Sequence, residues 1–71
     1  MSRHCAWIRC PGVRATFQAT WHSHKMLVCR GQHGWLWMLV RDRRVVDDGA
    51  AETRLAAQVS AFEAVCGVTE K

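Results

Sequence analysis

The sequence predicts an α+β domain: an antiparallel meander of three or four strands, with one C-terminal helix packed on one face of the sheet. Residues 14–21 alternate between apolar and polar side chains, and residues 35–41 form a dense apolar run between turn residues. Residues 50–66 are rich in alanine and carry apolar residues at helical spacing. Because the strands come first and the helix last, the order differs from the alternating strands and helices of parallel folds.

The whole chain, residues 1–71, is expected to form a single domain. Pro11-Gly12 favours a type II turn, and the polar residues at 22–25 and the glycines of 31–34 favour two further turns. Between and after these turns, the expected strands lie at about 4–9, 14–21, 26–30 and 35–41, with a short extension at 44–46 and a helix at about 50–66.

We expect two-residue turns at Pro11-Gly12, Ser23-His24 and Gln32-His33. These turns fix which residues lie opposite each other, and directly opposed residues have their side chains on the same face of the sheet. The face expected to receive the helix carries Ala6, Ile8, Ala15, Phe17, Ala19, Trp21, Met26, Val28, Trp37 and Leu39. The other face carries Cys5, Trp7, Thr16, Gln18, Leu27, Cys29, Leu36, Met38 and Val40.

The helix is expected to dock through its largest apolar residues. Leu55, Val59, Phe62 and Cys66 recur at i, i+4, i+7 and i+11, which is one face of a 3.6-residue period. We therefore expect this stripe to pack on Phe17, Trp21 and Trp37 of the sheet. Asp48 and Thr53 are the candidate caps for its start, and Gly67 is placed to end it.

The second sheet face is the first candidate binding site. Its apolar part exceeds the patch that a small monomer usually exposes, which points to a protein partner or to self-association as a homodimer. The residues concerned are Trp7, Leu27, Leu36, Met38 and Val40. The alternative is that the N-terminal segment folds over this face instead of pairing as a strand.

The charge distribution suggests a second candidate site, for nucleic acid. The chain has a net charge of +4, and residues 1–44 hold eight basic side chains against one acid. Residues 45–71 carry two basic and five acidic side chains, so the positive charge belongs to the first part. A solvated surface is the alternative explanation. The candidate phosphate contacts are Arg9, Arg14, Arg41, Arg43 and Arg44.

Four cysteines and four histidines raise the question of a zinc site. The spacings that could fit one are those of Cys5, Cys10, Cys29 and His33, with a further pair at His22 and His24. In an extended strand Cys5 and Cys10 lie on opposite faces, and the histidine pair falls in a polar turn. No metal or other cofactor is therefore expected.

Enzymatic activity is not expected either, because so short a chain has little room for a substrate pocket and shows no Gly-rich phosphate loop or paired carboxylates. No apolar run reaches the length of a membrane span, and the N-terminus lacks the apolar core of a signal peptide. The expected location is the cytoplasm, where the cysteines would stay reduced. Neither a membrane nor a small-molecule substrate is expected as a partner.

Small residues recur at helical spacing after a glycine in the C-terminal part: Gly49, Ala51, Thr53, Arg54, Leu55, Ala57, Ser60 and Ala61. This segment resembles the end of the third strand and the last helix of double-stranded RNA-binding domains, and the element order over residues 14–66 is similar to theirs. The resemblance implies strands followed by a closing helix, and binding to double-stranded RNA or DNA. In size and style the chain also looks like small proteins of phages and mobile elements, such as anti-CRISPR inhibitors. That likeness implies an inhibitor or adaptor that occupies a protein surface.

Overall fold

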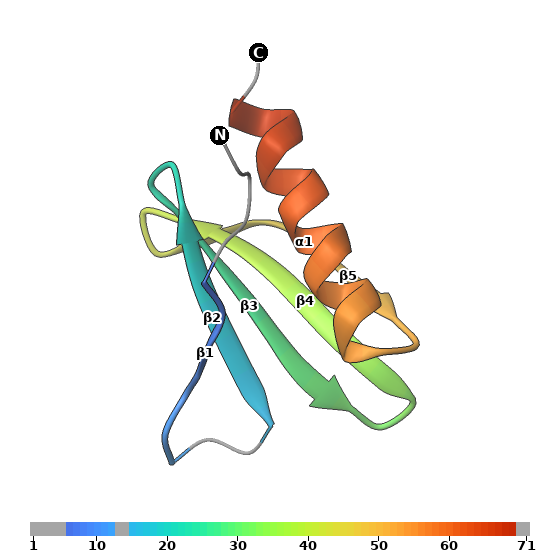
Figure 1. Cartoon of the computed structure of the whole chain (residues 1–71). Coiled ribbons are helices and arrows are strands. Elements are labelled where there is room, and N and C mark those ends of the chain that lie inside the picture. Colours follow the sequence, from blue (N-terminus) through green and yellow to red (C-terminus); the bar gives the residue numbers. More distant parts are fainter. Residues whose placement is uncertain (1–5, 13–14, 70–71) are drawn as a thin grey trace.

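The computed structural model describes residues 6–12 and 15–69. These residues form a five-stranded antiparallel sheet in the order β1-β2-β3-β4-β5, followed by one helix that crosses a single face of the sheet (Figure 1). The elements are β1 (Ile8–Arg9), β2 (Thr16–Trp21), β3 (His24–Gly31), β4 (Gly34–Arg41), β5 (Arg44–Ala51) and α1 (Arg54–Thr69). The predicted α+β class and the C-terminal helix are confirmed, whereas the strand number is five rather than three or four.

β5 is the strand that the sequence underestimated. The short extension predicted at 44–46 is a full strand of eight residues, and it continues through Asp47, Asp48 and Gly49. These residue types are depleted in strands, which is why the sequence suggested that the sheet ends there. The side chains of both aspartates are exposed, so this edge strand carries them without burying a charge. The pairing between β4 and β5 shifts between Leu39 and Val40, as at a β-bulge.

Gly49 has a specific packing role in β5. It lies opposite Trp37 of β4, and a Cβ placed on Gly49 would come within 2.6 Å of the Trp37 ring nitrogen. The missing side chain therefore makes room for the indole on the helix-covered face. A residue that is a poor strand former in isolation is required here by the size of its cross-strand neighbour.

Two hairpins close with tight turns of the same type. His22-Ser23 and Asp42-Arg43 all have positive φ angles, between 49° and 67°, as a type I′ turn requires at both central positions. The turn predicted at Ser23-His24 thus lies one residue earlier, and Trp21 pairs with His24. The partners change by two positions, so the predicted faces of β2 and β3 are retained.

The predicted pairing of the first strand is wrong. Ile8 lies opposite Gln18 rather than Ala15, because a loop longer than two residues connects β1 to β2. The Cys10 amide donates a hydrogen bond to the Thr16 carbonyl across this loop, at 2.8 Å. A change of three positions reverses the two faces of the strand. The expected strand at 4–9 is described only at Ile8–Arg9, and residues 4 and 5 lie outside the described part of the chain.

α1 begins immediately after β5 and packs against β3, β4 and β5. Of the two predicted capping residues, Thr53 caps the start of the helix. Its hydroxyl oxygen accepts a hydrogen bond from the Ala56 amide at 3.1 Å. The core between the two layers consists of Ala19, Met26, Leu39, Ala61 and Val65, with the partly buried Trp7, Trp21, Trp37, Phe62 and Ala64 around it.

The predicted buried face of the helix is wrong. Ala57, Ala61 and Val65 are fully buried, whereas Leu55 is 69% exposed and Val59 is 49% exposed. Within the predicted stripe Phe62 still reaches the sheet, where its ring meets that of Trp21 edge to face at 5.3 Å. The sheet already supplies large side chains such as Trp21 and Trp37, so small residues on the helix allow the two layers to approach closely.

Candidate functional site

The face of the sheet turned away from α1 is not covered by any other described element (Figure 1). The strand register arranges its side chains in three rows that run across the strands. We call this surface the open face. Its rows are Thr20, Lys25, Val40 and Val45; then Ile8, Gln18, Leu27, Met38 and Asp48; then Thr16, Cys29, Leu36 and Ala50.

The apolar residues of the open face are not spread evenly. They gather on β3, β4 and β5, whereas β2 contributes only hydroxyl and amide side chains. We call the cluster of Leu27, Leu36, Met38, Val40 and Val45 the apolar block. Leu36 is 46% exposed and Val45 is 53% exposed. A shallow hollow of about 420 Å³ lies at one side of the block, lined by Cys29, Leu36, Trp37, Met38, Asp48, Gly49 and Ala50.

Four of the five residues predicted for a protein-binding site lie together in this block: Leu27, Leu36, Met38 and Val40. Trp7 does not, because it packs against the core on the helix side, and its assignment to the open face was wrong. Ile8, at 60% exposure, occupies the open face in its place. The role of these residues in binding stays a prediction.

Sequence reasoning missed Val45 and Asp48 as members of the open face. Val45 lies opposite Val40, and Asp48 lies opposite Met38. The signal was available for Val45, because a two-residue turn at Asp42-Arg43 places Val45 against Val40. For Asp48 the β-bulge removed the simple relation between spacing and face.

A second exposed apolar surface lies on the outer side of α1. Leu55 and Val59 are one helical turn apart, and Val68 near the end of the helix is 47% exposed. Leu55 and Val59 form a separate and narrower stripe on the helix, whereas Val68 lies about 140° round the helix axis from Leu55. Any test of the open face must distinguish it from this helix stripe.

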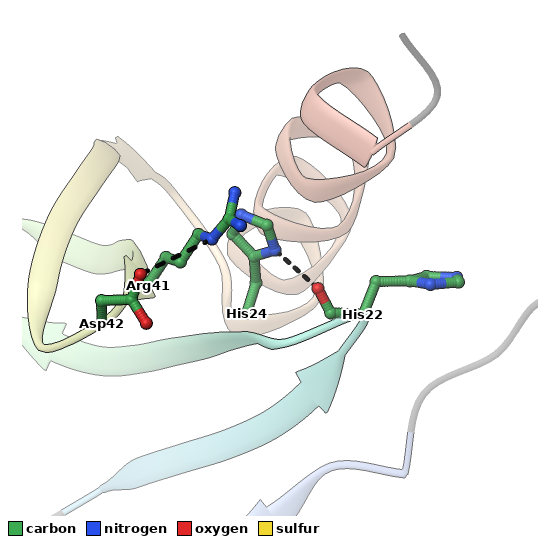
Figure 2. Close-up of polar contacts among 4 residues, drawn as sticks. All are labelled: His22, His24, Arg41 and Asp42. Atoms are coloured by element: carbon green, nitrogen blue, oxygen red, sulfur yellow. Dashed lines mark hydrogen bonds and ion pairs between the residues drawn. The ribbon is translucent and has the colours of Figure 1, made fainter.

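The two tight turns bring basic residues together. The β2–β3 and β4–β5 hairpins close at the same end of the sheet, and we call their side chains the turn end: His22, Ser23, Lys25, Arg41, Asp42, Arg43 and Arg44. Figure 2 shows part of this end, where Arg41 Nε lies 3.9 Å from Asp42 Oδ2. Both side chains are largely exposed, so this ion pair contributes little to stability. The turn end therefore combines four cations with one carboxylate.

The arginines predicted to bind nucleic acid do not form one surface. Arg41, Arg43 and Arg44 belong to the turn end, whereas Arg9 lies opposite Phe17, four positions along β2 from Trp21. Arg14 lies outside the described residues. Lys25 and His22 join the cluster from the neighbouring hairpin, which sequence spacing alone could not show.

The candidate metal ligands are not grouped in the described part of the chain. There, no three side chains among the histidines, cysteines and acids are placed to hold a metal ion. His24 is buried and its Nδ1 lies 2.9 Å from the His22 carbonyl oxygen, while the His22 ring points away from it (Figure 2). Cys10 and Cys29 are free thiols, and Cys5 lies outside the described residues.

Comparison with models of protein families, with curated proteins and with solved structures finds no match to this chain. Among the described residues, no helix has both the length and the apolar character needed to cross a membrane.

Proposed function

We propose that this protein is a small non-enzymatic binding protein that acts through its open face. One observation carries the proposal: a helix covers one side of the sheet, while on the other side the apolar block is uncovered, with Leu36 and Val45 exposed and the other members partly buried. Exposed apolar surfaces of this kind usually mark contacts with other proteins. Lys25 and Asp48 would contribute polar contacts around the block, because both lie on the same face.

The dimensions of the open face suit a modest protein interface. With about 4.8 Å between strands and about 3.4 Å per residue, five strands of up to eight residues span about 24 by 27 Å. A standard interface removes about 800 Å² from each partner. Since this span corresponds to about 650 Å², a partner would have to cover all of the open face and not the apolar block alone.

A second copy of the chain is the occupant we propose for the open face, because this face lacks the net positive charge of the rest of the chain. The chain carries a net charge of +4, so two copies repel each other over most of their surfaces. The open face contains one cation, Lys25, and one anion, Asp48, and is therefore neutral. In an isologous dimer the same surface of both copies is in contact. Lys25 of each copy could therefore pair with Asp48 of the other copy, which gives two ion pairs.

Two leucines make a matched test of this proposal. Leu36 lies in the apolar block and Leu55 on the helix stripe, and both are exposed. Leu36→Lys should abolish a dimer that light scattering detects for the natural chain, because it adds one unpaired charge per copy to the contact. Leu55→Lys, with the same change of charge, should leave the dimer intact.

The results of this test distinguish a second copy of the chain from a larger protein as the occupant of the open face. A natural chain that stays monomeric at every concentration would overturn self-association. If the monomer also shows no contact between its open face and a larger protein in its source cell, the binding proposal itself fails. Binding to a larger partner that Leu36→Lys removes and Leu55→Lys does not would instead support an inhibitor or adaptor. Equal loss in both variants would contradict a specific role for the open face.

Nucleic-acid binding is the second candidate function, and the observation that favours it is the cluster of cations at the turn end. It uses a different part of the molecule from the apolar block.

A further inference from the structure

The turn end contains a hollow that both hairpins line. It has a volume of about 330 Å³, and its lining includes the hydroxyl residues Thr20 and Ser23 together with Lys25 and Arg43. Asp42, His24 and Val40 complete the lining. Hydroxyl, ammonium and guanidinium groups are the side-chain donors that most often contact phosphate oxygens. The donor set therefore fits a phosphate group better than an apolar ligand.

The distance between the two turns shows that the cations of the turn end can contact more than one phosphate. The two turns are separated by two strand intervals, or about 10 Å, since β2–β3 and β4–β5 are neighbouring hairpins in one sheet. Arg41 and Arg44 flank the second turn as a directly opposed pair on the helix-covered face, whereas Lys25 lies on the open face. One phosphate in the hollow could contact Lys25 and Arg43, but contacts to all four cations require a chain of phosphates.

We propose that the turn end binds the sugar–phosphate backbone of nucleic acid, without reading its base sequence. Lys25, Arg41, Arg43 and Arg44 each neutralise a phosphate, and Thr20 and Ser23 donate hydrogen bonds to phosphate oxygens. This interaction does not depend on the open face being a protein interface. Lys25 stands at the corner where the turn end and the open face meet, so it is not used as a test residue.

Arg9 and Arg43 provide a matched pair of variants. Both side chains are exposed, and charge reversal to glutamate changes the net charge of the chain equally. Arg9 lies about 13 Å along the sheet from the turn end, given four residues at about 3.3 Å each. An effect of total charge alone would therefore be the same for both, whereas a local site would respond to Arg43 only.

Fluorescence anisotropy with labelled DNA of defined sequence measures the effect, with single-stranded and duplex forms in parallel. Four phosphate contacts predict that the logarithm of the binding constant falls with the logarithm of salt concentration at a slope of about −3 to −4 on the duplex. Arg43→Glu should weaken binding about tenfold at low salt and make the slope shallower by about one unit. Arg9→Glu should change affinity less than about threefold. Circular dichroism confirms that both variants are folded.

Four results would contradict the proposal. The first is no binding of either DNA form at low salt. The second is equal weakening by Arg9→Glu and Arg43→Glu, which would mean attraction to total charge. The third is competition by polyglutamate that is as strong as competition by unlabelled DNA at equal charge, which would indicate an acidic protein surface as the ligand. A change of DNA sequence at constant length should leave the affinity unchanged, and a strong sequence preference would contradict binding to the backbone alone.

Discussion

On the face of the sheet that α1 covers, Met26, Val28 and Leu39 are fully buried, whereas on the open face Leu36 is 46% exposed. These residues come from β3 and β4, whose side chains are largely apolar on both sides. The difference in burial therefore does not arise from the strands themselves. It arises because the single helix α1 covers only one face of the sheet. This difference in burial is the basis for proposing that the apolar block contacts a partner.

The largest effect on stability is predicted for a substitution of Leu39, and Leu36 provides the matched control. They occupy the same strand on opposite faces. Leu39→Ala should lower the free energy of unfolding by about 2–5 kcal/mol, because it leaves a cavity in the core. Leu36→Ala should change it by no more than about 0.5 kcal/mol. Chemical denaturation at low protein concentration measures both without a contribution from association. Equal losses would mean that both faces of β4 are buried in the isolated chain.

The two sides of α1 give a second, smaller contrast. Ala61 is fully buried and Leu55 is 69% exposed. Ala61→Leu should lower the free energy of unfolding by about 1–3 kcal/mol, because the added methylenes push the helix away from the sheet. Leu55→Ala should have an effect within about 0.5 kcal/mol. Thermal melts of the two variants compare them directly. If Leu55→Ala proved the more destabilising, the helix would be docked through the stripe that the sequence suggested.

These contrasts show how much of the fold the sequence could predict. The period of two in β2 and the apolar run of β4 predicted strands correctly, because local pattern decides strand formation there. The helix was predicted for the same reason, but not its buried face. Leu55 and Val59 lie outside, since the bulk of Trp21 and Trp37 on the sheet favours the smaller Ala57, Ala61 and Val65 at the centre of the contact. That preference depends on the opposing layer, which helical periodicity does not contain.

The candidate sites were predictable to different degrees. The register of β3 and β4 follows from the turn at Gln32-His33, so Leu27 and Met38 were correctly paired on one face. Trp7 was misplaced because its strand pairs across a loop whose length the Pro11-Gly12 motif did not reveal. The turn end joins residues some twenty positions apart in the chain, and only the strand order brings them together.

The most direct test of the open face is a dilution series followed by methyl-detected NMR. Samples between about 10 μM and about 1 mM bracket a dissociation constant of about 100 μM. A dimer formed through the open face should give concentration-dependent shifts for the methyl groups of Leu27, Leu36, Met38 and Val40, with the signals of Leu55 and Val59 unchanged. Shifts confined to Leu55 and Val59, or a spectrum that is the same at every concentration, would contradict self-association through the apolar block.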